Sequence, residues 1–406
     1  MTTTQRAAKV LVFGCWDRGC GYPRSDALLE AMRRRGVVVH ECHFTMPYRG
    51  PEKRRLLRRP HLWPGYLLSK LRVRRGAARM LRRAIAEFRP DIVLVPYPGY
   101  FTVHWARAVW KGPLVLDLFL SAYDTAIIDR HYFPPGSLMA RFMLRLDRRA
   151  CAAADRVLVD TPNNVEFVAG MVPDGADSVR WVPVSDPHEP NPPAPYAPPA
   201  AGQRMEVLFF GTGVPLHGLF HLIEAMHTCE RVRLTLFGGS FEDRCRARLV
   251  PPQRLRRLDE FAPEREIRRH LGSTHLVAGV FGTSPKTSRV VPFKVMLALA
   301  TGRPVITADT PAIRTFLRSD EFIAVPPGDA AALSATLQGL VDQPGRLAQV
   351  AEAGHRAYQR CFSLEVVGQR LLDVFAELGV AHAPAAQQLP VAALSASSTP
   401  ESLGSA

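Results

Sequence analysis

Short, unbroken runs of apolar residues recur along the first half of the chain. They cover Val10–Gly14, Val37–His40, Asp91–Pro96, Leu114–Asp117 and Arg156–Asp160. Because these runs hardly alternate with polar residues, they indicate strands that are buried on both faces, as in a parallel sheet. Helical stretches separate them, notably Ser25–Arg35 and Leu138–Ala154. The alternation predicts a doubly wound α/β domain whose ligands lie at the carboxyl ends of the strands.

The second half of the chain repeats the pattern. Strands are predicted at Glu206–Phe210, Arg233–Phe237, Leu276–Val280, Pro304–Thr307 and Phe322–Val325. Among the helices predicted here are Phe293–Ala300 and Leu364–Leu378, and Ser363 is the expected N-cap of the latter. The second half therefore reads as another Rossmann-like domain.

Eight prolines crowd the stretch from Val182 to Gln203, which neither a helix nor a central strand tolerates. This stretch predicts a linker over residues 183–203 between an N-terminal Rossmann-like domain at 1–182 and a C-terminal one at 204–360. A C-terminal helix is expected within 361–380. Residues 381–406 are rich in Ala, Pro, Ser and Gln, and they are expected to be disordered.

The net charge of +15 favours an anionic partner such as a phosphate, a membrane surface or a nucleic acid. Part of this charge can also be an ordinary solvated surface. The seven cysteines are odd in number and lack a Cys-x-x-Cys pair, so neither a disulfide framework nor a zinc site is suggested. No run reaches 18 apolar residues, and the expected location is cytoplasmic or peripheral on the inner face of a membrane.

Residues Lys53–Arg89 carry thirteen Lys or Arg side chains interleaved with leucines, Trp63 and Tyr66. Basic charge beside aromatic and apolar groups suits a segment at an anionic membrane surface. A solvated helical surface packed on the first domain is the alternative.

Three cations gather at the start of a predicted helix in the second half. Lys286, Arg289 and Lys294 stand near Phe293, where the helix offers unpaired N–H groups and the positive end of its dipole. Gly302 is expected to end this helix in a left-handed conformation. Such a place is suited to a phosphate group.

A glycine-rich loop follows the first strand of the second half. It contains Gly211, Thr212, Gly213, His217 and Gly218, and its backbone N–H groups can bind a phosphate. Gly238 ends the next strand and permits a close approach to a nucleotide. The alternative is a set of tight turns that need glycine for their backbone geometry.

Polar residues in the first half supply candidates for the other side of a site. Asp117 ends a predicted strand and Asp124 follows it closely, so these carboxylates are candidates for orienting an acceptor hydroxyl or a donor sugar. Helix capping and loop bracing are the alternative. Arg18 and Arg24 lie in the loop after the first strand, where they could meet the acceptor or the donor phosphate.

The segment Pro292-Phe-Lys294 to Gly302-Arg-Pro304-Val-Ile resembles the signature of the retaining family-4 glycosyltransferases, also described as glycosyl transferases group 1. The resemblance implies a GT-B fold, two Rossmann-like domains that face a central cleft. It also implies a nucleotide-sugar donor at Gly211, Thr212, Gly213, Gly218, Gly238, Lys286, Arg289 and Lys294, with His217 at a position that the family gives to a lysine. The two glutamates of the family signature fall on Arg289 and Leu297.

The expected reaction is therefore the transfer of a sugar to an acceptor hydroxyl with retention, in the biosynthesis of surface polysaccharides, glycolipids or other glycosides. Asp117, Asp124 and His217 are the expected catalytic groups. The acceptor is a glycan, a lipid-linked molecule or a small molecule, and an anionic membrane surface is a further expected partner. No Asp-x-Asp sequence occurs, so neither a metal nor another cofactor is expected.

Two alternatives use other chemistry. An epimerase or a phosphorylase of GT-B fold would use the same cleft. A non-catalytic basic protein that binds nucleic acid is the other class, but the sequence contains no aromatic and basic recognition module of the usual kind, and no nucleic-acid partner is expected.

Overall fold

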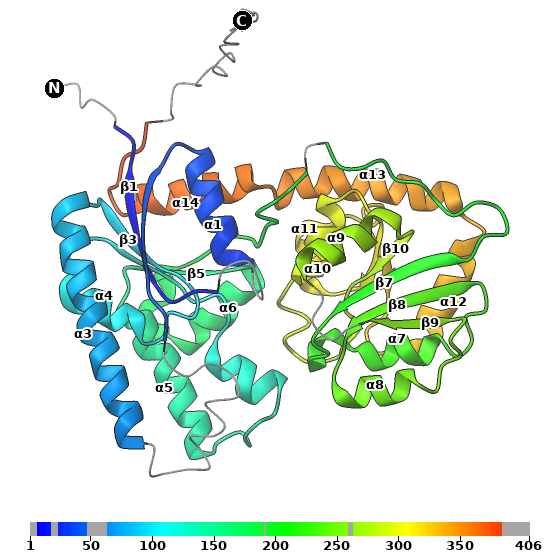
Figure 1. Ribbon diagram of the computed structural model, residues 1–406, viewed down its shortest axis with the longest axis horizontal. Helices are drawn as coiled ribbons and strands as arrows, with labels where there is room; N and C mark the ends of the chain where they lie inside the picture. The colour runs from blue at the N-terminus through cyan, green and yellow to red at the C-terminus, as the bar shows by residue number, and fades with distance from the viewer. Residues whose placement is uncertain (1–5, 18–22, 47–62, 191, 259–262, 384–406) are drawn as a thin grey trace, which may run out of the picture.

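The computed structural model describes residues 6–17, 23–46, 63–190, 192–258 and 263–383. The N-terminal domain contains a six-stranded sheet in the order β2-β1-β3-β4-β5-β6, and all its strand pairs are parallel (Figure 1). Its strands are β1 (Lys9–Gly14), β2 (Val38–His43), β3 (Ile92–Val95), β4 (Leu114–Asp117), β5 (Arg156–Val159) and β6 (Val179–Trp181). The predicted doubly wound α/β arrangement is confirmed for this half.

Helices cover both faces of this sheet. One face packs on α3 (Trp63–Phe88), α4 (Thr102–Val109), α5 (Leu138–Ala152) and α6 (Pro162–Met171). The other packs on α1 (Arg24–Arg34) and on the last helix of the described chain, α14 (Leu364–Glu377). Two short turns, η2 (Asp124–Asp129) and η3 (Pro173–Ser178), follow β4 and α6. The apolar strand runs are buried on both sides, which explains why they lack alternation.

The C-terminal domain is built in the same way around a sheet of order β12-β11-β10-β7-β8-β9, again with parallel pairs. Its strands are β7 (Met205–Gly211), β8 (Val232–Gly238), β9 (Leu255–Leu258), β10 (Leu276–Ala278), β11 (Val305–Ala308) and β12 (Ile323–Val325). The helices α7 (Leu219–Ala225), α8 (Phe241–Ala247) and α12 (Ala330–Val341) cover one face. The other face packs on α9 (Glu264–Ser273), α10 (Phe293–Ala300) and α11 (Pro311–Phe316).

Two segments connect the domains. The described residues between Trp181 and Met205 form no helix or strand, as their prolines require. After the C-terminal domain, α13 (Pro344–Cys361) leads into α14, which returns to the N-terminal domain and packs on α1 (Figure 1). Ser363 caps α14 by accepting a hydrogen bond from the backbone N–H of Val366.

The apolar side chains of α14 belong to the core of the N-terminal domain. Leu371, Val374 and Phe375 are buried together with Leu28 and Met32 of α1. The chain therefore begins and ends its described part in the same domain. Of the predicted tail at 381–406, all but residues 381–383 lies outside the described residues.

Candidate active site

A pocket of about 290 Å³ lies between the two domains, at the carboxyl ends of their strands. The N-terminal domain contributes Arg24, Phe119, Thr125, Asp129, Arg130 and Asp160 to its walls, and the C-terminal domain contributes Gly211, Thr212, His217, Lys286 and Lys294. In α/β domains, ligands bind at this edge of the sheet, in the crevice formed by the loops that follow the strands. The pocket brings together candidates that lie up to 270 positions apart in the chain.

Lys294 is the second residue of α10, and only 4 % of it is exposed. Its Nζ lies 3.6 Å from the centre of the Phe209 ring and has no hydrogen-bond partner. Burial lowers the pKa of this amine well below its ordinary value. A buried cation without a partner is costly, so the site gains when an anion binds beside it.

His217 lies close to this lysine, on the turn η4 (Pro215–His217). Its Nδ1 is buried and has no hydrogen-bond partner. Burial, and then the charges of Lys294 and Arg130, lower the pKa of its imidazole well below the ordinary value. A Cβ atom at Gly211 would lie 2.8 Å from His217 Cε1 and 3.1 Å from Lys294 Nζ, so only glycine leaves room between them.

The other glycines of the predicted phosphate loop hold its shape. Gly213, Gly218 and Gly238 have φ angles of 68°, 55° and 85°, a region that favours glycine. A Cβ at Gly218 would lie 2.2 Å from the backbone nitrogen of Gly282, and one at Gly213 would lie 2.2 Å from that of Ser240. Of the predicted loop residues, Gly211, Thr212 and His217 line the pocket, while Gly213, Gly218 and Gly238 are not among its lining residues.

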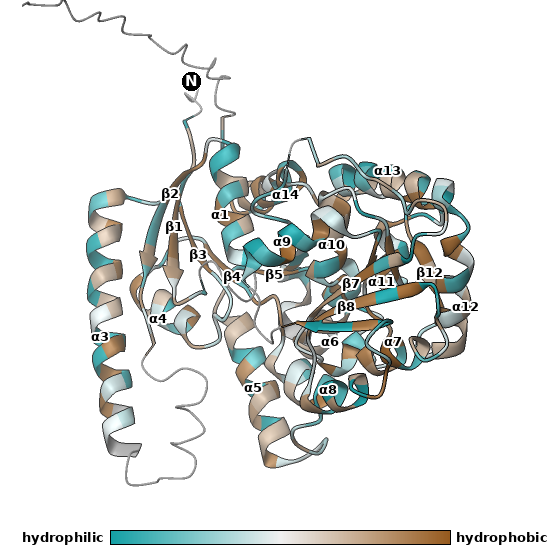
Figure 2. Cartoon of the chain, turned by 45° about the vertical axis from the view of Figure 1, so that its right-hand side comes forward, coloured by the Kyte–Doolittle hydropathy of each residue, from teal (hydrophilic) through white to brown (hydrophobic). Residues whose placement is uncertain are grey.

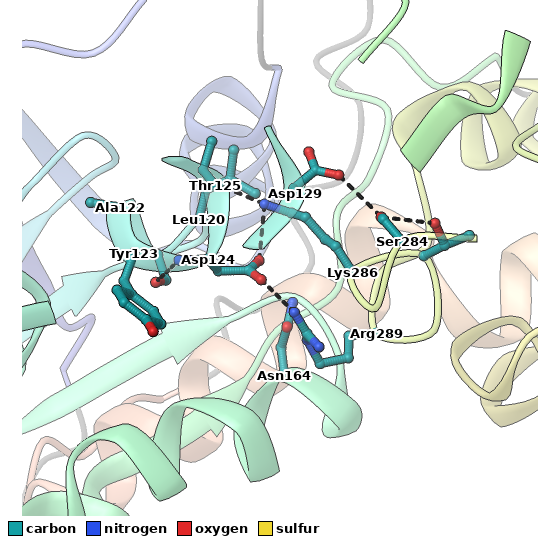
Figure 3. A network of polar contacts seen from close by, with 12 residues as sticks. Leu120, Ala122, Tyr123, Asp124, Thr125, Asp129, Asn164, Ser284, Lys286 and Arg289 are labelled. Carbon is teal, nitrogen blue, oxygen red and sulfur yellow. Dashed lines mark hydrogen bonds and ion pairs between the residues drawn. The ribbon is translucent and has the colours of Figure 1, made fainter. Parts of the chain in front are cut away.

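Lys286 and Arg289 contact the opposite domain. Lys286 Nζ lies 3.1 Å from Asp124 Oδ2 and donates a hydrogen bond to Thr125 Oγ1 at 3.0 Å, and Arg289 forms an ion pair with the same Asp124 (Figure 3). Ser284 Oγ also donates to Asp129 Oδ1 across the interface, at 3.1 Å. Asp124 therefore compensates part of the charge of these two cations, and only Lys286 of the three lines the pocket.

Asp117 is fully buried at the end of β4 and is held by Arg24, the first residue of α1. The guanidinium donates from Nε to both carboxylate oxygens, at 2.8 and 2.9 Å, and from Nη1 to the carbonyl oxygen of Val182 at 2.8 Å. Arg24 also lies over the Phe119 ring, 5.0 Å from its centre. Bracing of α1 against the strand ends is therefore the role that the geometry shows for this pair.

Asp160 is a carboxylate that sequence reasoning did not select. It directly follows β5, lines the pocket and is 3 % exposed. Asn164 Nδ2 donates to its Oδ1 at 2.5 Å, and no described cation forms an ion pair with it. Burial raises the pKa of this carboxyl, and the hydrogen bond from Asn164 and the charges of Arg24 and Lys286 oppose the rise. The rule that selected Asp117, a carboxylate at a strand end, also points to Asp160.

Two further positions complete the comparison with the sequence. Arg18 lies outside the described residues. Leu297, which takes the position of a glutamate in the resembled signature, is buried in the apolar core of the C-terminal domain. A leucine side chain there offers no hydrogen-bonding group to a ribose.

Within the described residues, no three His, Cys, Asp or Glu side chains gather so that they could hold a metal ion. No helix in the same residues is long and apolar enough to cross a membrane.

Two family models match the chain, one in each domain. The model described as Glycosyltransferase Family 4 matches residues 25–183, and the model described as Glycosyl transferases group 1 matches residues 204–343. No curated protein matches the chain.

Solved structures share the fold at low sequence identity. Sucrose-phosphate synthase from Thermosynechococcus elongatus has a TM-score of 0.66 at 16% identity, over 92% of this chain and 99% of that one. Anabaena HepE in complex with UDP-glucose has a TM-score of 0.61 at 16% identity, over 91% and 99%. The lipopolysaccharide outer core galactosyltransferase WaaB has a TM-score of 0.60 at 13% identity, over 91% and 99%. All three superpose over both domains of this chain.

Proposed function

Since this chain is a glycosyltransferase of the GT-B fold, we propose that it moves a sugar from a nucleotide-sugar donor to an acceptor hydroxyl, with retention of anomeric configuration. The C-terminal domain binds the donor, and the N-terminal domain presents the acceptor from the opposite wall of the pocket. The products belong to surface polysaccharides, glycolipids or related glycosides. HepE holds UDP-glucose, which makes this nucleotide sugar the first donor to test.

The observation that carries this proposal is the unpartnered pair of Lys294 Nζ and His217 Nδ1 at the N-terminus of α10. Breaking the bond between sugar and phosphate develops negative charge on the leaving diphosphate. A bound diphosphate favours the protonated forms of Lys294 and His217, and these charges stabilise it together with the free N–H groups at the helix N-terminus.

Lys294→Met is expected to weaken binding of the donor nucleotide about tenfold or more, because a charge-assisted contact contributes about 1.5–3 kcal/mol. The same variant is expected to melt at a higher temperature without ligand, since it removes a buried, unpaired cation. The folded pKa of Lys294 lies below its unfolded value, so wild-type stability should rise with pH up to about 10.4, and the variant should lack this rise. Calorimetry with UDP and thermal melts across pH measure both effects.

Lys9→Met is the matched control. Lys9 Nζ also lies over an aromatic ring, 4.7 Å from the centre of Phe88, but it donates to the Phe88 carbonyl oxygen at 2.5 Å and lies far from the pocket. Its loss should leave donor affinity unchanged and should not raise the melting temperature. Wild-type donor affinity in a folded Lys294→Met protein would remove this lysine from the donor site.

Activity is expected to survive EDTA, because protein groups supply the positive charge beside the diphosphate. Transfer is measured with and without the chelator on protein dialysed free of metals. Complete loss of transfer, restored by Mg²⁺ or Mn²⁺, would contradict this account.

The same assay separates transfer from the related chemistries. A transferase releases the nucleotide diphosphate only in proportion to glycosylated acceptor. An epimerase would convert the donor with no acceptor present, and a phosphorylase would require inorganic phosphate.

A further inference from the structure

An exposed apolar surface lies beside the pocket, on the segment that joins η2 to α5. Tyr132, Phe133, Leu138, Met139 and Phe142 are all exposed, and Leu138, at 83 %, is the most exposed large apolar residue described. Single exposed apolar residues are ordinary, but five within eleven positions form a patch of the kind that binds a partner. We refer to residues 131–142 as the apolar segment.

Exposed positive charge lies on the two helices α5 and α3 at this side of the N-terminal domain. Arg141 and Arg145 are exposed on α5, and residues 131–146 contain no Asp or Glu. On α3, residues 63–86 contain seven Lys or Arg and no acidic residue, and Leu68 and Leu71 are exposed beside them. Apolar groups flanked only by cations complement an anionic lipid surface, where the apolar groups enter the acyl boundary and the cations remain at the headgroups.

The basic helix and the apolar segment lie on one layer of the molecule. The helices α3, α4 and α5 pack on the same face of the N-terminal sheet. Arg107 of α4 donates to the Ala153 carbonyl oxygen at the end of α5, at 2.9 Å, and Lys70 of α3 lies 5.4 Å from the centre of the Phe101 ring at the start of α4. The N-terminal ends of α3 and α5 lie at the same end of the domain (Figures 1 and 2).

The apolar segment also borders the pocket. Arg130, the residue just before it, lines the pocket, and its guanidinium lies 5.9 Å from the centre of the Tyr132 ring. Asp124 and Asp129 of the preceding turn contact the C-terminal domain. A lipid surface bound to the apolar segment would therefore lie at one side of the pocket.

We propose that the apolar segment and the exposed cations of α3 dock the protein on an anionic phospholipid bilayer. Docking needs only the surface described above. Docking in this orientation also presents the pocket to a lipid-linked acceptor in the same bilayer. This second step rests on the proposed function.

Co-sedimentation with vesicles tests the docking surface. The full chain is expected to pellet much more strongly with phosphatidylglycerol vesicles than with phosphatidylcholine vesicles at 0.1 M NaCl, and apolar insertion alone accounts for the weaker binding to the neutral lipid. At 1 M salt the charge attraction is screened within about 3 Å, so only the binding due to apolar insertion should remain. The double variant Leu138→Ser with Phe142→Ser should lose that salt-resistant part, at least tenfold in partitioning. Replacing Arg72, Arg75 and Arg79 by Gln should lose the salt-sensitive part.

Phe241→Ser with Leu249→Ser is the matched control. Both residues are strongly exposed, at 76 % and 75 %, but they lie on the C-terminal domain, far from α3, and Glu242 stands among the arginines beside them. This variant should bind vesicles as wild type does. All variants keep the pocket and should transfer sugar to a soluble acceptor at the wild-type rate, so failure of docking is distinguishable from failure of the proposed function.

Three outcomes would overturn the proposal. One is negligible or equal pelleting with both lipids. Another is wild-type binding by the variant of Leu138 and Phe142. The third is a wild-type protein that binds no lipid but sediments as a dimer, with the Leu138 and Phe142 variant sedimenting as a monomer. The patch would then join two copies of the chain.

Discussion

Asp160→Asn is expected to lower kcat at least a hundredfold and to leave the Kd for the donor nucleotide near its wild-type value. Asp160 is a buried pocket carboxylate without an ion-pair partner among the described residues, and it lines the site from the N-terminal domain. A positioned base contributes about 10²–10⁴ to a reaction of this kind. Asparagine has the same shape as aspartate and can still accept the hydrogen bond from Asn164. The fall in kcat therefore measures the contribution of the negative charge.

The pH dependence of this effect has a definite sign. Burial raises the pKa of Asp160, and a base acts only when it is ionised. Wild-type activity should therefore fall as the pH drops through this raised pKa, at a higher pH than an ordinary aspartate gives. The acid limb should disappear in Asp160→Asn and return in Asp160→Glu.

Asp129→Asn is the control for this prediction. Asp129 is equally buried and lines the same pocket, but it accepts a hydrogen bond from Ser284, and asparagine can accept the same bond. A change of no more than a few-fold is expected. If Asp160→Asn instead weakened donor binding as much as it slowed turnover, Asp160 would belong to the donor site.

Arg24→Met is expected to destabilise the N-terminal domain by about 3–5 kcal/mol, because it leaves the Asp117 carboxylate buried and unpaired. The double variant Arg24→Met with Asp117→Leu should recover most of this loss, since it removes both charges. Recovery should be incomplete because the Val182 and Val159 carbonyl oxygens also lose a donor. Urea unfolding followed by far-ultraviolet circular dichroism measures the three free energies of unfolding.

The comparison between the single and double variants decides the role of the pair. A loss below about 1 kcal/mol in Arg24→Met would mean that Asp117 is protonated or hydrated in the folded protein. A double variant as unstable as the single one would mean that the carbonyl contacts, and not the ion pair, hold α1 in place.

Local sequence predicted the buried parts of the fold well. The helix Phe293–Ala300 and the strand Leu114–Asp117 have the predicted bounds, and Gly302 has the expected left-handed conformation, with φ 67°. Those elements are apolar runs between clear boundaries. The strand β9 was not predicted because it is an edge strand, Leu-Arg-Arg-Leu, whose arginines face solvent.

The helix α13 was also missed, for a different reason. Small residues form much of its buried face, and Gly354 lies so close to Leu299 and Glu321 that a Cβ there would meet their atoms at 2.7 and 2.9 Å. The buried positions recur at helical spacing, but the face carries few of the large apolar side chains that mark the other helices. The predicted α/β class did not depend on it.

The site was less predictable because its partners are distant in sequence. Lys286, Arg289 and Lys294 look equivalent along the chain, yet two of them pair with Asp124 and one remains unpartnered. In the same way, Asp117 and Asp160 both end strands, but only Asp117 meets Arg24. Packing within the N-terminal domain pairs Arg24 with Asp117, and packing between the domains pairs Asp124 with Lys286 and Arg289. A local sequence pattern cannot predict either choice of partner.

The return of α14 to α1 makes the C-terminal domain an insertion within the N-terminal one. A chimera that exchanges the C-terminal domain with that of a related enzyme therefore needs two junctions, one near Met205 and one near Ser363. A single crossover in the linker would pack α1 against the last helix of the other enzyme. The residues at positions 371, 374 and 375 would then no longer match the N-terminal core in which Leu371, Val374 and Phe375 pack. Recombination between such enzymes should accordingly preserve the first and last segments as a pair.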